Sequence, residues 1–189
     1  MKGILPLFLV IALFFTNCNK DDNSPDGNLS APCCTFSSPT LNYNPTVGGF
    51  DMCTGSSVST NANGDITSIA LQFHSYCNTG DYDWIMGAGI NGLGSPIISG
   101  QTYNITGGPL ANSPWATFEF LDYNCSGAFP QVSYNNASTG NGQVKFNVDF
   151  TNNEISGEFT LTGADPLGLL PPKTVVCIFS GLPIQVFSM

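Results

Sequence analysis

The 189-residue chain contains no arginine and only four lysines, so basic side chains are almost absent. Recognition of nucleic acids and phosphate groups depends on clusters of Lys and Arg. The 13 acidic residues bring the formal net charge to −9. The composition therefore argues against nucleic-acid binding, and it disfavours contact with anionic lipid head groups.

The chain also lacks a segment of useful length with helical periodicity, and it has no internal repeat. Charged residues make up only 9% of the sequence, whereas Gly, Pro, Asn, Ser and Thr are abundant. A hydrophobic content of 42% is enough for a packed core. This balance predicts a β-rich extracellular domain with many turns.

The apolar run Ile4–Phe15 is too short to cross a bilayer, which takes about 20 apolar residues in a helix. Lys2 precedes the run and Cys18 follows it, which is the layout of a bacterial lipoprotein export signal. We predict that residues 1–17 are a signal peptide and that Cys18 carries the lipid, through which alone we expect the chain to contact a membrane. The alternative is an ordinary cleavage nearby that leaves Cys18 as a plain thiol.

Residues 18–32 read as the lipidated cysteine and a flexible tether, because Asp, Asn, Ser, Pro and Gly dominate them. Residues 33–189 then form a single all-β domain. The start of the tether, Cys18-Asn19-Lys20-Asp21-Asp22, resembles the lysine-then-acidic export signal of surface lipoproteins in Bacteroidetes-type bacteria. That resemblance implies a lipid anchor in the bacterial outer membrane, with the domain facing the cell exterior. A solvated linker explains the same residues, and the two interpretations are compatible.

Short alternating runs separated by turn residues fill the domain, which predicts strands with one apolar face. The clearest are Gln143–Phe150 and Ile155–Leu161, and the turn residues 151–154 between them predict a β-hairpin. The other predicted strands are Ile69–His74, Trp84–Ile90, Trp115–Tyr123, Thr174–Phe179 and Leu182–Phe187. Such strands need a second apolar face, so the fold is an antiparallel sandwich or a barrel-like domain.

Three strand motifs carry a further resemblance. They are Gly142-Gln143-Val144-Lys145-Phe146, Ile155-Ser156-Gly157-Glu158-Phe159-Thr160-Leu161 and Ser99-Gly100-Gln101-Thr102-Tyr103-Asn104-Ile105. Together they resemble the C-terminal strands of a group of uncharacterised Bacteroidetes-type outer-membrane lipoproteins, with an "isGxFxF" strand after a "GxVxIT" strand. The resemblance covers about half of the domain. It implies an all-β lipoprotein and supplies no active site.

Seven cysteines are present, and setting Cys18 aside leaves six, an even number that suits an oxidising compartment. We expect the six to form three disulfides, and the parity supports lipidation of Cys18. The sequence has no Cys-x-x-Cys pair, so it predicts neither a zinc site nor a redox site. The disulfide candidates are Cys33, Cys34, Cys53, Cys77, Cys125 and Cys177.

Asp81, Tyr82, Asp83 and Trp84 form the most suggestive local cluster, because two carboxylates alternate with two aromatic rings. Aromatic faces stack on sugar rings and carboxylates ligate Ca²⁺, although the oxygen ligands of an EF-hand loop are missing. Trp84 also continues an apolar face, which favours a structural role. The single histidine, His74, falls on the opposite face from Ile69 and is expected to be exposed to solvent.

These features predict a non-catalytic binding module at the cell surface, with a glycan or an extracellular protein as ligand and without a metal or cofactor. One alternative is a structural envelope protein, and the oligomeric state is left open. A second alternative is a secreted hydrolase with paired carboxylates, since the separation that matters there is spatial. The candidate carboxylates are Asp81, Asp83, Glu119, Asp122, Glu154 and Glu158.

Overall fold

The structure is a computed structural model that describes residues 35–47, 50–51, 55–105, 114–125, 130, 132–135, 141–165 and 167–188. The predicted signal peptide, Cys18 and the tether lie outside these residues. So do three of the disulfide candidates, Cys33, Cys34 and Cys53. No helix among the described residues is long and apolar enough to cross a membrane.

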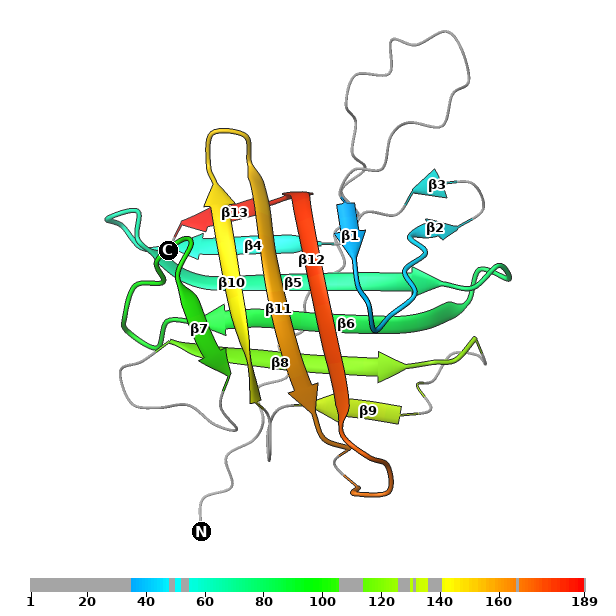
Figure 1. Ribbon diagram of the computed structural model, residues 1–189. Helices are drawn as coiled ribbons and strands as arrows, with labels where there is room; N and C mark the ends of the chain where they lie inside the picture. Colours follow the sequence, from blue (N-terminus) through cyan, green and yellow to red (C-terminus); the bar gives the residue numbers. More distant parts are fainter. Residues whose placement is uncertain are drawn as a thin grey trace, which may run out of the picture.

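Two sheets, antiparallel except for one parallel strand pair formed by the end of the chain, pack face to face as a sandwich (Figure 1). The 5-stranded sheet has the order β1 (Thr35–Ser37), β12 (Lys173–Pro183), β11 (Glu154–Gly163), β10 (Asn141–Asp149) and β7 (Thr102–Ile105). The 6-stranded sheet has the order β13 (Gln185–Ser188), β4 (Ser56–Thr60), β5 (Ile66–Tyr76), β6 (Tyr82–Asn91), β8 (Trp115–Asp122) and β9 (Val132–Asn135). Strands β2 (Thr46–Val47) and β3 (Phe50–Asp51) form a separate small hairpin. The prediction of an all-β sandwich is confirmed.

The long strands of the two sheets run crosswise in Figure 1 rather than along one another. This is the orthogonal form of sheet packing, in which corners are made by strands that change sheets. The end of the chain makes such a corner, because β12 ends at Pro183 and β13 pairs with β4 of the other sheet. The prediction of a single strand over Leu182–Phe187 was therefore wrong, because Leu182 still belongs to β12 and a new strand begins at Gln185.

The predicted hairpin is confirmed as β10 and β11, which pair antiparallel from Asn141↔Thr162 to Asp149↔Glu154. Asn153 takes a positive φ of 54° in the turn, a conformation that Asn tolerates well. Gly157 of the "isGxFxF" motif faces the core. A Cβ there would lie 2.6 Å from the Lys145 carbonyl oxygen and 2.7 Å from Phe146. Glycine at this position leaves room for the Phe146 ring of the neighbouring strand to pack over β11.

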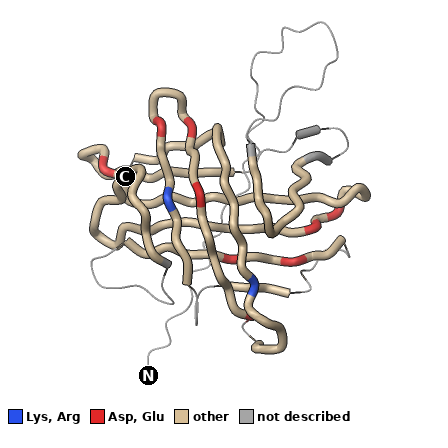
Figure 2. The backbone as a smooth tube through the Cα atoms, viewed as in Figure 1, with Lys and Arg blue, Asp and Glu red and all other residues tan. Residues whose placement is uncertain are grey.

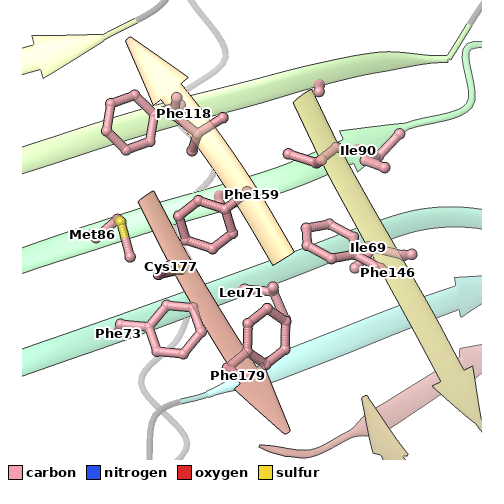
Figure 3. Packing of buried hydrophobic residues seen from close by; sticks show 14 of the residues in the cluster. Ile69, Leu71, Phe73, Met86, Ile90, Phe118, Phe146, Phe159, Cys177 and Phe179 are labelled. Carbon is pink, nitrogen blue, oxygen red and sulfur yellow. The ribbon is translucent and has the colours of Figure 1, made fainter. Parts of the chain in front are cut away.

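Charged residues are sparse along the described backbone (Figure 2). The interior consists of aromatic and aliphatic side chains. Phe73 of β5 meets Phe179 of β12 with ring centroids 5.3 Å apart in an edge contact (Figure 3). Phe159 of β11 lies 6.3 Å from the same Phe73 ring. These contacts join the two inner faces into one core, as the alternation of apolar residues requires.

Cys177 belongs to this core and is not in a disulfide. Its side chain is 1% exposed on β12, where it pairs in register with Phe159. Burial among apolar groups raises the pKa of its thiol far above the ordinary value. The expectation that all six domain cysteines pair is therefore wrong, and the parity argument for a lipid on Cys18 loses its force. Cysteine counting could not detect a thiol used as a small apolar side chain.

Two of the six disulfide candidates are bonded to each other. Cys77, after β5, joins Cys125, after β8, across 48 residues of sequence. The bridge ties the turn between β5 and β6 to the end of β8. Closing a loop of that length in the unfolded chain corresponds to about 4 kcal/mol of stabilisation in the chain-entropy account.

Candidate functional site

The four residues Asp81–Trp84 do not form one site, because the strand sends them in different directions. Asp81 is exposed in the turn before β6, where its carboxylate accepts a hydrogen bond of 3.0 Å from the Thr79 hydroxyl. Trp84 is 4% exposed and stacks on Phe120 with centroids 5.7 Å apart. Its indole N–H donates to the Asn42 carbonyl at 2.8 Å. Trp84 is a core anchor, and it offers no ring face to a ligand.

Asp83 lies beside the disulfide instead of beside a metal-binding loop. Its carboxylate and the sulfurs of Cys77 and Cys125 lie within 4.8 Å of one another. Because the two sulfurs are bonded to each other, they are not metal ligands. Burial, then the Asp122 carboxylate, raises the pKa of Asp83, and the Lys173 ammonium opposes them.

Lys173 closes this end of the sandwich. Its Nζ lies 3.3 Å from the Asp122 carboxylate, 4.0 Å from the ring centroid of Phe120 and 5.8 Å from that of Tyr134. The ammonium thus links the first residue of β12 to β8 of the other sheet through an ion pair and cation–π contacts. We interpret this cluster as a clamp between the sheets.

Tyr82 belongs to a different group, on the outside of the 6-stranded sheet. Three tyrosines and the histidine make up this tyrosine group: His74, Tyr76, Tyr82 and Tyr123. The Tyr82 ring lies 5.1 Å from Tyr76, 5.5 Å from Tyr123 and 5.4 Å from His74, centroid to centroid. A bulge between Ser75 and Tyr76 re-aims the ends of β5 and β6 and brings these rings together.

His74 is buried, so the prediction of a solvent-exposed histidine was wrong. Only 7% of its surface is exposed, because the neighbouring tyrosine rings cover it. Burial lowers the pKa of the imidazole to about 4. Its Nδ1 lies 3.3 Å from the Tyr76 hydroxyl, and its buried Nε2 has no hydrogen-bond partner in the described part of the chain.

Next to the tyrosine group, the outer face of the same sheet carries two rows of small or polar side chains. One row crosses four strands in register from Ser57 through Ala70 and Gly89 to Thr117. The next row runs from Gln72 through Gly87 and Glu119 to Asn135. We call this surface the glycine platform, and it consists of Ser57, Ala70, Gln72, Gly87, Gly89, Thr117, Glu119 and Asn135.

Strand geometry sets the size of the glycine platform. Four strands about 4.8 Å apart span about 14 Å, and the two rows lie about 7 Å apart along the strands. No described atom lies within 4 Å of the place where a Cβ at Gly87 would sit, so the surface is open there. The next row holds His74, Ile85, Leu121 and Ser133, so apolar and aromatic groups border the platform at one end.

A depression lies on the outside of the 5-stranded sheet. It has a volume of about 270 Å³ and lies over β10, β11 and β12. Lys145 and Glu158 face each other across neighbouring strands there, and the exposed Ile178 lies at its side. The remaining lining residues are Thr102, Gln143, Val144, Phe159, Thr160, Val176 and Cys177.

The six candidate carboxylates are spread over the molecule. Asp83 and Asp122 influence each other near Lys173. Glu119 lies on the glycine platform, whereas Glu154 and Glu158 belong to β11 of the other sheet. Gly87 and Gly89 share a face of the predicted strand Trp84–Ile90, but the alternation alone gives them no role. The rows become visible only when strand register is known.

No protein-family model matches the chain, and neither the curated proteins nor the solved structures compared with it include a match.

Proposed function

We propose that this chain is a lipid-anchored binding module of the bacterial cell surface that takes a neutral glycan on its glycine platform. The observation that carries the proposal is the pair of rows across four strands whose side chains are either small or polar, with two glycines at the centre. A sheet face without aromatic or large apolar side chains lets a flat ligand lie close to the backbone at the glycines.

The chemistry of the platform suits sugar hydroxyl groups. Ser57 and Thr117 can donate and accept hydrogen bonds, and the Gln72 amide can do both as well. The bordering Tyr82 supplies an aromatic ring, and such rings stack on the apolar faces of sugars. Polar groups beside aromatic ones are the usual composition of small-ligand sites.

The scarcity of cations supports a neutral ligand over an anionic one. The described residues contain two lysines, and the Lys173 ammonium is already paired with Asp122. Lys145 lies on the other sheet, opposite Glu158. Sulfated or phosphorylated glycans would meet no basic group on the platform, where Glu119 carries the charge.

The anchor is proposed from the sequence alone. The short apolar run before Cys18 and the Lys20-Asp21-Asp22 stretch after it support export to the outer membrane and an outward-facing domain. Metabolic labelling with a fatty-acid probe tests the anchor. We expect the wild type to be labelled and the Cys18→Ala variant to be unlabelled, and equal labelling of both would contradict the proposal.

A glycan array, probed with and without calcium and chelator, tests the ligand. Gly87→Phe should abolish binding to any neutral glycan found, because the ring fills the open space over the platform. Phenylalanine suits a strand, so the fold should persist. Thr160→Phe on the other sheet is the matched control and should bind like the wild type. The reverse pattern would move the site to the depression on the 5-stranded sheet.

A wholly negative array would shift weight to the alternative of a structural envelope protein. The hydrolase alternative makes a different prediction, namely release of shortened glycan that stops in Asp83→Asn and Asp122→Asn variants. We favour binding because the platform lies on the outside of the sheet, whereas Asp122 is occupied by its ion pair with Lys173.

A further inference from the structure

The loop between β11 and β12 carries the most exposed large apolar side chains in the described part of the chain. Leu167 and Leu169 are each 78% exposed, and Leu170 is 42% exposed. We call these three residues the leucine tip. The loop protrudes at the end of the sandwich opposite the β10–β11 turn, and beyond Asp165 it bears no charge (Figures 1 and 2).

The leucine tip is held in shape by one carboxylate. Asp165 Oδ1 accepts the Leu167 amide at 3.0 Å, and Oδ2 accepts the amides of Leu169 at 2.9 Å and Leu170 at 3.1 Å. These bonds lower the pKa of Asp165, so the carboxylate stays ionised and keeps its three donors. A loop fastened in this way projects its leucines without an ordering cost on binding.

The backbone donors of residues 166–172 are all accounted for. The Gly168 amide donates to the Asp165 carbonyl at 2.9 Å, in addition to the three amides on the carboxylate. Residues 166, 171 and 172 are prolines and have no amide N–H. Seven consecutive residues therefore present no free backbone donor. A segment that enters an apolar medium must meet this condition, whereas a water-exposed loop need not.

We infer that the leucine tip inserts into the surface of a lipid bilayer and orients the domain on it. The occupant is a membrane of neutral lipids, because the chain is acidic and the tip carries no cation to attract anionic head groups. The lipid anchor is then one of two membrane contacts, which revises the expectation of attachment through the N-terminal lipid alone. Two weak membrane signals together give stable attachment.

The chain is long enough to make both contacts at once. Thr35 pairs with Ser180, seven residues along β12 from Lys173 at the base of the loop, or about 23 Å away. The 17 residues from Cys18 to Thr35 can span at most about 58 Å. The anchor can therefore lie in the same membrane as the tip. This step rests on the proposed lipidation of Cys18, whereas the insertion of the tip does not.

Fluorescence quenching tests the inference on the full, processed chain in phosphatidylcholine vesicles with brominated acyl chains. A Leu169→Trp variant should lose about half of its added emission, since interfacial side chains reach a depth of about 5–10 Å. Phe150→Trp, 45% exposed at the opposite end of the sandwich, is the matched control and should lose none. The wild-type signal of Trp84 and Trp115 is subtracted. Adding Asp165→Ala to Leu169→Trp should weaken the quenching, because the tip loses its three bonds.

Flotation of the vesicles separates this inference from the anchor. If the protein floats with the vesicles but the added emission of Leu169→Trp is quenched no more than that of Phe150→Trp, insertion of the leucine tip is contradicted and the anchor still stands. Quenching at millimolar lipid in a chain that takes up no fatty-acid label would support the tip without the anchor. Unquenched Leu169→Trp emission that is shielded from iodide on intact cells would assign the tip to a protein partner and overturn the inference.

Discussion

Protonation of His74 should destabilise the domain, and the effect can be worked out from the structure. The folded chain holds the pKa of the imidazole at about 4, because the tyrosine group buries it. The unfolded chain has the ordinary value near 6.5. Between these values the unfolded state binds more protons, so the stabilisation from neutral His74 is full above about pH 6.5 and falls as the pH drops.

The expected loss is about 2 kcal/mol at about pH 5 and about 3 kcal/mol once the pH falls below about 4. Other carboxylates titrate in the same range, so the quantity to measure is the difference between the wild type and His74→Gln. The variant keeps a neutral polar side chain beside Tyr76, and the acidic residues are common to both proteins.

Urea unfolding at a series of pH values gives the two stability curves. We expect the difference in unfolding free energy between the two proteins to be constant above about pH 6.5. It should change by about 2 kcal/mol in favour of the variant as the pH falls toward about 5. The single histidine also gives one imidazole signal in the NMR spectrum, with an expected midpoint near 4. Parallel stability curves, or a midpoint near 6.5, would refute the burial of His74 by the tyrosines.

Three further substitutions test the fold. Trp84→Ala should cost about 3–5 kcal/mol in urea unfolding because it empties a core position, and a loss below about 1 kcal/mol would place the ring outside the core. Replacing Cys77 and Cys125 together by serine should cost about 4 kcal/mol, and an unchanged urea midpoint would show that they do not pair. Gly157→Ala should cost about 1–3 kcal/mol because the new methyl group meets the Lys145 carbonyl and the Phe146 ring, whereas a stabilised variant would mean that β10 can shift away freely.

Much of the fold follows from strand periodicity. The apolar residues of β10 and β11 alternate strictly, so both the hairpin and its inner face are predictable. Cys177 shares one face of its strand with Val175 and Phe179, and this position marks it as a core residue. Counting cysteines alone concealed that signal, because parity carries no information about burial.

The candidate site was harder to predict, because a bulge at the ends of β5 and β6 interrupts the alternation that would put residues i and i+2 on one face. Tyr82 and Trp84 frame Asp83 in sequence, yet one ring lies outside the sheet and the other in the core. His74 is covered by Tyr76 of its own strand and by Tyr82 of the neighbouring β6, and the second contact appears in no local pattern. The glycine platform likewise depends on the register of four strands, and register is a tertiary property.

The proposed binding surface can be tested directly by titrating the isotopically labelled protein with the strongest neutral glycan from the array and following backbone amide shifts. We predict that the shifts cluster on β5, β6 and β8, centred on Gly87 and Gly89, and spread toward Tyr82 beyond the bordering row. Shifts confined to β10, β11 and β12, or no shifts at saturating glycan, would contradict it.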